Sequence, residues 1–239
     1  MKTIKTLIAI PAMQTVPTKF LRSLESLRRL PDTYTSVSEC TLIHDARNEF
    51  ASIAIQNGFD RVLWLDSDMV FEPDTLERMS ALMDAGPDMD MVCGLYFTRT
   101  LPTKPVIYKS MPENEDGFLI LEQYTDYPRD ALFRIEACGF GCVLTTVRLL
   151  KRAWDKYGPP FSYYRNVGED MSFCCRVRDL GVDIWCDSSI RVGHVGHVIF
   201  SESTYLAQTG SCQTNQGNDH QGADIQSNPS SAQTITTAR

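Results

Sequence analysis

The stretch Val62-Leu-Trp-Leu-Asp-Ser-Asp68 carries the strongest signal in this chain. Four large apolar residues form a strand pattern and lead directly into two carboxylates separated by one serine. Ligands bind at the carboxyl ends of the strands in an open α/β sheet. Two carboxylates there can turn toward one point and offer the oxygen ligands that Mg²⁺ or Mn²⁺ prefers beside phosphate. Asp66, Ser67 and Asp68 are therefore predicted to form a metal or nucleotide site, with a solvated turn or helix cap as the alternative.

The segments around this stretch predict a mostly parallel sheet. Through residue 95, strand patterns alternate with helical spacing of apolar residues, which is typical of a doubly wound α/β domain. Residues 96–145 carry four prolines and only short strand patterns, 142–146 among them, which predicts a small mixed or antiparallel extension. The expected fold class is an α/β fold with a mostly parallel central sheet, flanked by helices, and this extension. The main expected strands are 4–10, 34–40, 61–65, 89–95, 183–186 and 190–195, and the expected helices are 17–30, 45–57, one beginning at Pro73, 146–157 and 169–180.

The end of the chain differs in composition from the rest. Residues 207–239 are rich in Gln, Ser, Thr, Asn and Gly, and their only large aliphatic residues are Ile225 and Ile235. Such a segment cannot bury enough apolar surface to offset its ordering entropy. We therefore expect a single domain over 1–206 and a flexible polar tail over 207–239.

The overall composition excludes several classes of protein. With 239 residues, 43% hydrophobic and 22% charged, the chain is typical of a globular protein. No apolar run approaches the ~20 residues of a membrane-spanning helix. The net charge of −7 disfavours indiscriminate binding to nucleic acid or anionic membranes. The amino terminus lacks a signal-cleavage pattern, and the eight cysteines contain no CxxC pair and are typical of reduced, packed thiols, so we expect a cytoplasmic protein.

Seven short motifs follow one another along the chain. They are Ile8-Ala-Ile-Pro-Ala-Met13, Asp45-Ala-Arg-Asn48, Val62-Leu-Trp-Leu-Asp-Ser-Asp68, Gly94-Leu-Tyr-Phe-Thr-Arg99, Gly139-Phe-Gly-Cys142, Gly168-Glu-Asp-Met-Ser-Phe-Cys174 and Gly193-His-Val-Gly196. In this order, over residues 4–200, they resemble the glycosyltransferases of the GT-A fold, close to the small stand-alone enzymes of the family-2-like group. The resemblance implies a Rossmann-like sheet and a metal-dependent hexosyltransferase that moves a sugar from a UDP- or GDP-linked donor to an acceptor hydroxyl. It also implies a nucleotide-binding half over 1–95 and a half over 96–206 that binds the acceptor and completes the metal site.

The resemblance assigns a metal site to Asp66, Asp68 and His194, with the Asp-Ser-Asp stretch as the DXD motif. Asp68 coordinates Mn²⁺ or Mg²⁺, Asp66 supports the ion or the ribose hydroxyls, and His194 completes the metal shell. A cation is needed because the departing diphosphate builds negative charge. His197 would face the other side of a continued strand, so we do not expect both histidines to bind. A packing role is the alternative for His194.

Further residues are expected at the donor. The segment 11–13 lies along the nucleoside, and Arg47 lies near the base and phosphate unless it is a surface arginine of its helix. Arg99 contacts phosphate or lies in a solvated loop. Glycine lets a ligand approach the backbone closely, so two glycines are expected to line the donor-sugar or acceptor pocket. The residues expected to bind the donor are Pro11, Ala12, Met13, Arg47, Asp66, Ser67, Asp68, Arg99, Gly139 and Gly141.

Glu169 and Asp170 match the acidic pair that faces the acceptor in this group. In inverting members the aspartate is the general base that removes the proton of the acceptor hydroxyl. In retaining relatives the same region positions the acceptor or donor. Capping of a helix amino terminus is the alternative for these acids.

Other functions stay open on the sequence alone. The stretch Asp66-Ser-Asp68-Met-Val70 also resembles the first motif of haloacid-dehalogenase-like phosphatases, in which the first Asp is the nucleophile and the second a general acid. No Gly-Asp-x-x-x-Asp motif follows downstream, however. A sugar nucleotidyltransferase is disfavoured because the loop after the first strand lacks a Gly-rich basic pattern. A non-catalytic nucleotide-sugar-binding module is a further alternative. The acceptor, which could be a glycan, a protein, a small molecule or a modified nucleic acid, and the oligomeric state are not specified by any motif.

Overall fold

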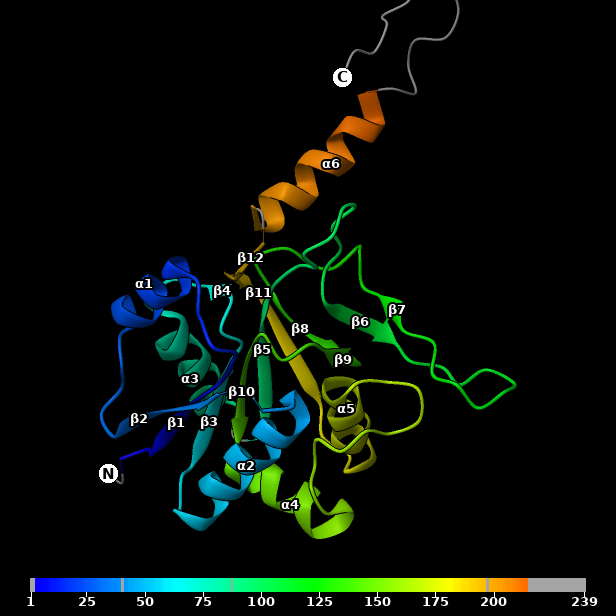
Figure 1. The fold of residues 1–239 in the computed structure, drawn as a ribbon. Coiled ribbons are helices and arrows are strands. Elements are labelled where there is room, and N and C mark those ends of the chain that lie inside the picture. The colour runs from blue at the N-terminus through cyan, green and yellow to red at the C-terminus, as the bar shows by residue number, and fades with distance from the viewer. Residues whose placement is uncertain (1–2, 40, 87, 197, 215–239) are drawn as a thin grey trace, which may run out of the picture.

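The computed structural model describes residues 3–39, 41–86, 88–196 and 198–214. Its main sheet has seven strands (Figure 1). In spatial order they are β2 (Thr33–Glu39), β1 (Thr6–Ala12), β3 (Arg61–Leu65), β10 (Cys142–Thr146), β5 (Met91–Leu95), β11 (Ile184–Arg191) and β8 (Leu132–Ile135). β10 and β8 run antiparallel to their neighbours, and the others are parallel. The predicted α/β class with a mostly parallel central sheet is confirmed.

Helices cover both faces of the sheet because successive strand side chains point to opposite sides. In β3, Val62 and Trp64 belong to one core, and Leu63 and Leu65 belong to the other. The first core is completed by α2 (Ile43–Gln56), α4 (Val147–Tyr157) and α5 (Glu169–Asp179), and the second by α1 (Thr18–Ser26) and α3 (Thr75–Ala85) (Figure 1).

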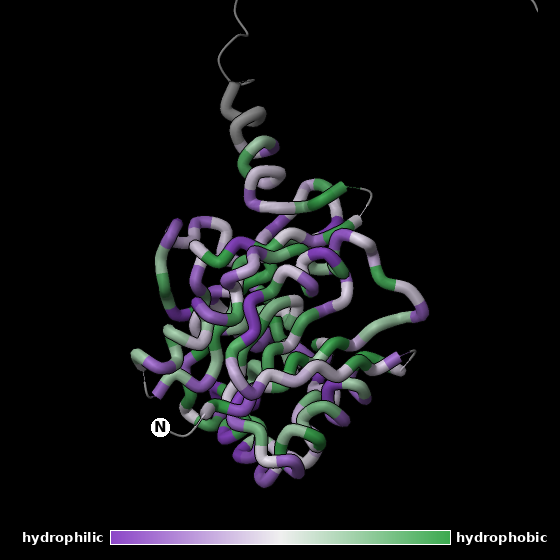
Figure 2. Tube along the Cα trace, turned by 90° about the vertical axis from the view of Figure 1, so that its left-hand side faces the viewer, coloured by the Kyte–Doolittle hydropathy of each residue, from purple (hydrophilic) through white to green (hydrophobic). Residues whose placement is uncertain are grey.

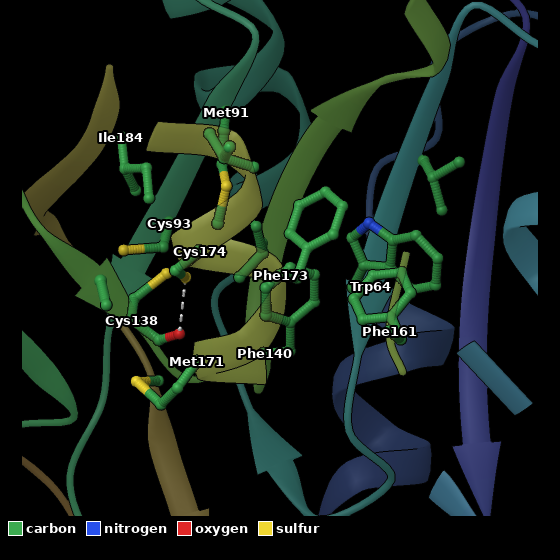
Figure 3. Packing of buried hydrophobic residues seen from close by; sticks show 14 of the residues in the cluster. Trp64, Met91, Cys93, Cys138, Phe140, Phe161, Met171, Phe173, Cys174 and Ile184 are labelled. Carbon is green, nitrogen blue, oxygen red and sulfur yellow. Dashed lines mark hydrogen bonds between the residues drawn. The ribbon is translucent and has the colours of Figure 1, made fainter. Parts of the chain in front are cut away.

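The larger core is rich in aromatic rings and thiols (Figure 3). Phe161 stacks on Phe173 at 4.6 Å between ring centroids, and Trp64 lies 5.0 Å from Phe161. The Cys174 thiol donates to the Cys138 carbonyl at 3.5 Å. The free cysteines among the described residues are Cys93, Cys138, Cys142, Cys174, Cys175 and Cys186, and all except the half-buried Cys175 are buried. The prediction of packed thiols is confirmed for the five buried cysteines, whereas Cys40 and the side chain of Cys212 lie outside the described part.

β10 occupies a different place from the one expected. The sequence placed 142–146 in a small mixed or antiparallel extension of the central sheet, but the strand lies at the centre of that sheet between β3 and β5. Because β10 is antiparallel to both, its amino end lies at the same edge as their carboxyl ends. The Gly139–Gly141 segment therefore reaches the edge at which β3 delivers Asp66, and the Asp66 N–H donates to the Gly141 carbonyl at 3.1 Å.

Two small antiparallel sheets extend this edge. The first joins β4 (Met69–Val70), β12 (Gly193–Val195) and β13 (Ile199–Phe200), and the second joins β7 (Glu122–Gln123), β6 (Ile107–Ser110) and β9 (Ala137–Cys138). The second sheet lies within residues 96–145 and is the antiparallel extension that the sequence predicted, whereas the strands of the first lie outside that range. The first of them pairs segments more than 120 positions apart in the chain, since His194 is opposite Met69.

Helix α6 (Glu202–Thr214) extends away from the body of the fold (Figures 1 and 2). The predicted tail began at 207, but 207–214 continue this helix, and 215–239 lie outside the described residues. The helix is fastened at its base: Tyr205 stacks on Phe97 at 5.4 Å, and the Gln208 amide bonds both the N–H and the carbonyl of Thr103. Among the described helices, none combines the length and apolarity needed to cross a membrane.

Candidate active site

A pocket of about 650 Å³ opens at the carboxyl edge of the parallel strands. One wall comes from the end of β1 and from the residues around the start of α2, and it is largely apolar. The other wall comes from the turn after β3, the loop after β5 and strand β12, and it is charged. The lining residues are Pro11, Ala12, Met13, Thr41, Leu42, Ile43, Asp66, Ser67, Asp68, Arg99 and His194.

His194 reaches Asp68 because β12 pairs with β4. The Val195 N–H donates to the Asp68 carbonyl at 2.8 Å, and the His194 Nε2 lies 3.4 Å from the Asp68 Oδ2. The other ring nitrogen, Nδ1, lies 2.8 Å from the carbonyl oxygen of Phe97. A carbonyl can only accept, so Nδ1 carries a proton and Nε2 is the nitrogen directed at Asp68. The predicted proximity of His194 and Asp68 is thus present, and His197 lies outside the described residues.

Arg99 also faces Asp68. Its Nη1 lies 2.7 Å from the Asp68 Oδ2, and its side chain is 54% exposed. Burial alone would raise the pKa of Asp68, but the interaction with His194 and the charge of Arg99 outweigh it, so the pKa lies below its ordinary value. Asp68 is therefore held as a carboxylate, facing cationic or polar groups at the pocket.

Asp66 faces a different set of groups. Arg47 of α2 donates from Nη2 to the Asp66 Oδ1 at 2.8 Å, and its Nη1 lies 3.7 Å from the Glu169 Oε1. The Arg47 side chain is only 3% exposed and lies 5.0 Å above the Phe140 ring. Burial raises the pKa of Asp66, and the positive charge of Arg47 opposes this increase. The negative charges of Asp68 and Asp170 raise the pKa further, so that it reaches about 6. Arg47 is thus the counter-charge of a buried acidic cluster.

This placement changes the expectations for Arg47. Its burial excludes a surface arginine of the helix. It does not line the pocket either, so the structure gives no support to a direct contact with base and phosphate. The physical reason is that Arg47 lies on the buried face of α2, which packs against the sheet. There its guanidinium is paired with the carboxylates of Asp66 and Glu169 and does not reach the pocket surface.

Glu169 and Asp170 form the first turn of α5, beside Arg47. The Asp170 Oδ1 accepts the N–H of Met171 at 2.7 Å. Burial raises the pKa of Asp170, Arg47 opposes this shift, and Glu169 adds to it, with a net increase. A carboxyl group with a raised pKa accepts a proton more readily, which suits a general base. Neither acid is part of the lining of the pocket described above.

Gly139 and Gly141 are buried under the ring of Tyr96. A Cβ atom on Gly139 would lie 1.9 Å from the Tyr96 hydroxyl oxygen, and one on Gly141 would lie 2.9 Å from its Cζ. The space that the two glycines leave is thus filled by a side chain of the protein, and neither glycine lines the pocket. The expectation that they line it meets no support in this arrangement.

Several residues of the site have little or no signal in the sequence. Thr41, Leu42 and Ile43 are part of the largely apolar wall, and their only signal was their position at the start of the helix of Arg47. Tyr96 and Phe97 belong to the Gly94–Arg99 motif. Nothing in the sequence, however, distinguishes the ring of Tyr96 or the carbonyl of Phe97 from those of ordinary packing residues. Of the predicted residues, those that do line the pocket are Pro11, Ala12, Met13, Asp66, Ser67, Asp68, Arg99 and His194.

The donor set on the charged wall fits a divalent metal ion in part. Carboxylate and neutral imidazole are both ligands of Mn²⁺, and a ligating histidine commonly donates its second N–H to a carbonyl, as His194 does to Phe97. Within the described part of the chain, however, no three His, Cys, Asp or Glu side chains converge on one point. Asp68 and His194 would hold the ion together with oxygens of a bound ligand, while Asp66 is directed to Arg47.

The sequence matches no known family model and no curated protein. Solved structures do match. The chain is similar to A197 from STIV, with a TM-score of 0.59, 19% identity, and coverage of 81% of this chain and 86% of A197. It is also similar to GalNAc-T7, solved with UDP, GalNAc and Mn²⁺, with a TM-score of 0.57, 12% identity and coverage of 81% of this chain. The fold is GT-A-like. The match spans 44% of GalNAc-T7, and at these identities the likeness concerns the fold.

Proposed function

We propose that this protein is a metal-dependent glycosyltransferase that uses a nucleoside-diphosphate sugar, UDP- or GDP-linked, as donor. One observation carries the proposal. Asp68, His194 and Arg99 come together on the charged wall of a pocket whose opposite wall is apolar. Such a pocket offers an apolar surface to a base and cationic or metal-binding groups to a diphosphate. The GT-A-like fold, which the chain shares with a structure solved with UDP and Mn²⁺, supports the same function.

The residues divide the work of this reaction. Residues 11–13 and 41–43 would hold the nucleoside, and Arg99 would leave Asp68 and turn to the diphosphate. Asp68 and His194 would hold Mn²⁺ or Mg²⁺, which neutralises the charge of the leaving diphosphate.

Asp170 is the proposed base. It would take the proton of the acceptor hydroxyl while that oxygen forms a bond to the anomeric carbon. The bond from this carbon to the diphosphate breaks, and the diphosphate leaves with the electron pair. The charges of Arg47 and Glu169 act on Asp170 in opposite directions, so they would set how readily it takes the proton.

The thiols support the cytoplasmic location that we propose. Disulfides form in oxidising compartments and are rare in the cytosol. The described cysteines are all free, although Cys93, Cys138 and Cys174 lie together in one core. This arrangement suits a reducing environment.

The test is a thermal-shift screen with UDP, GDP and CDP and with their sugar conjugates, each with and without Mn²⁺. A ligand that binds only the native state raises the apparent stability. We expect an increase in Tm with one nucleotide that depends on Mn²⁺, and this nucleotide then identifies the donor base. Equal binding without Mn²⁺ would contradict the metal assignment. No shift with any nucleotide, together with release of phosphate from a phosphomonoester, would indicate the phosphatase alternative instead.

A further inference from the structure

Tyr96 lies between His194 and the backbone of Gly141, next to the candidate site, but it does not line the pocket. It follows the last residue of β5 and is 6% exposed. Its ring meets the ring of His194 edge to face, with 5.7 Å between centroids and an interplanar angle of 75°. On the other side, its hydroxyl oxygen accepts the N–H of Gly141 at 3.4 Å. One side chain thus contacts both the histidine of β12 and the backbone before β10.

Gly141 connects Tyr96 to the Asp-Ser-Asp turn. The Gly141 carbonyl accepts the N–H of Asp66 at 3.1 Å. Met69 closes the same turn, because its N–H donates to the Asp66 carbonyl at 3.2 Å, and its sulfur would lie 2.9 Å from a Cβ atom on Gly141. A continuous series of contacts therefore runs from His194 through Tyr96 and Gly141 to Asp66, and through the turn to Asp68.

The position of the Tyr96 ring is fixed closely. The hydroxyl oxygen would be 1.9 Å, and Cζ 3.1 Å, from a Cβ atom on Gly139. The Tyr96 carbonyl accepts the N–H of Val106, so the backbone at this residue is held as well. Packing at interior density leaves the ring no alternative position unless the Gly139–Gly141 segment moves. His194 is consequently held from two directions, by this ring and by the Phe97 carbonyl on its Nδ1.

We infer that Tyr96 is a positioning residue that sets the placement of His194 relative to Asp68 and thereby the affinity for the divalent ion. The inference rests on the proposed function, because it assumes that these two residues hold a metal ion beside a nucleoside diphosphate. Tyr96 does not itself touch the ion or the nucleotide. Its action passes through the ring of His194 and through the backbone of Gly141.

The experiment measures the Mn²⁺ concentration that gives half of the nucleotide-induced thermal shift, with UDP or GDP as the probe. Groups behind a metal ligand typically change metal affinity about 10–100-fold when they are replaced. For Tyr96→Ala we expect this midpoint to rise about 10-fold or more. Tyr96→Phe keeps the ring against His194, so the Mn²⁺ midpoint of this variant should remain within about threefold of the wild type. Such a result would show that the ring, and not the hydroxyl group, positions His194.

Tyr127 provides a matched control, because it is also a buried tyrosine with one hydroxyl hydrogen bond, to Glu202 at 2.9 Å. Tyr127→Ala should lower Tm in a similar way but leave the Mn²⁺ midpoint unchanged. A Tyr96→Ala protein that is less stable than the wild type, with an unchanged midpoint, would show a purely structural role and overturn the inference. If Tyr96→Ala does not fold, Tyr96→Leu replaces it in the comparison.

A double substitution tests the geometry directly. Gly139→Ala should force the Tyr96 ring away and raise the Mn²⁺ midpoint, since the added methyl group collides with the hydroxyl oxygen. In a Tyr96→Phe background that oxygen is absent, so we expect the combined variant to recover part of the lost metal response. Additive effects of the two changes would contradict the proposed chain of contacts. If the wild type shows no Mn²⁺-dependent shift with any nucleotide, the proposed function itself fails, which is a different outcome.

Discussion

Asp66 and Asp68 are separated by one serine, but their surroundings differ in nearly every respect. Asp66 faces Arg47 and the acids of α5 in a buried cluster, and its pKa is raised to about 6. Asp68 faces His194 and the half-exposed Arg99 at the pocket, and its pKa is lowered. The partners of Asp66 come from helices α2 and α5, whereas those of Asp68 come from strand β12 and the loop after β5.

The difference indicates a division of roles within one short motif. On the Asp66 side, a buried arginine already pairs with Asp66 and Glu169, so these groups hold parts of the protein together. On the Asp68 side, the carboxylate is paired with a solvent-exposed cation that can leave and with an imidazole nitrogen, so this side is available to a ligand. We therefore expect substitutions on the two sides to change different quantities.

The largest effect is expected at the acid pair beside Arg47. Asp170→Asn removes the proposed base and should lower turnover about 10²–10⁴-fold, with nucleotide binding unchanged. The measurement is release of nucleoside diphosphate from the donor found in the thermal screen. Asp179→Asn, an exposed position at the other end of the same helix, is the control. Full turnover by Asp170→Asn would remove the base assignment.

The second prediction concerns stability. Arg47→Met leaves buried carboxylates without a counter-charge, which typically costs about 3–5 kcal/mol. Arg99→Met removes an exposed cation and should cost less than about 1 kcal/mol. Urea denaturation of both variants gives the two free energies of unfolding. Equal losses would show that the two sides do not differ as the structure indicates.

The third prediction concerns ligand binding on the other side. Asp68→Ala should weaken Mn²⁺-dependent nucleotide binding by about 100-fold, because it removes the ligand that faces the pocket directly. Its stability should change little, since Asp68 is partly solvated and its cationic partner is exposed. Titration calorimetry with nucleotide and Mn²⁺ provides the test, and Asp155→Asn, on an exposed helix face, is the control. Unchanged affinity would refute the metal assignment.

The smallest expected effect is a dependence on pH. The folded-state pKa of Asp66, about 6, lies above the ordinary value of about 3.9, so the folded protein binds this proton more tightly than the unfolded chain. Its favourable contribution is complete below about pH 4 and is lost as the pH rises through 6. Relative to Asp66→Asn, the wild type should lose about 1–3 kcal/mol between pH 4 and 7, given about 1.4 kcal/mol for each pKa unit. A constant difference across this range would contradict the raised pKa.

Local patterns in the sequence predicted much of the fold. The β-strand at 61–65 is present with the same bounds, and the helix expected at 169–180 is found at Glu169–Asp179. Both segments are defined by periodicity and by flanking residues, which are properties of the segments themselves. The position of β10 was not predictable in this way, because the spatial order of strands depends on which distant segments pair.

The same distinction applies to the site. Ser67 and Asp68 follow the end of β3 and residues 11–13 lie at the end of β1, so their place at the pocket edge could be predicted from the strand ends alone. The partner of Arg47 could not, because whether an arginine on a helix faces solvent or the sheet depends on how the helix packs. The two glycines were assigned to a ligand because nothing in the sequence shows that Tyr96 fills the space beside them.

The bond between Gln208 and Thr103 has a practical consequence for anyone who shortens this protein. Gln208 lies in a polar segment that composition alone would mark for removal, yet its amide holds both backbone groups of Thr103, in the loop that carries Arg99. A version that ends at 206 loses this attachment, whereas one that ends after 214 keeps it. Deletion boundaries chosen from sequence composition would thus remove a support of the pocket while leaving every residue of the pocket in place.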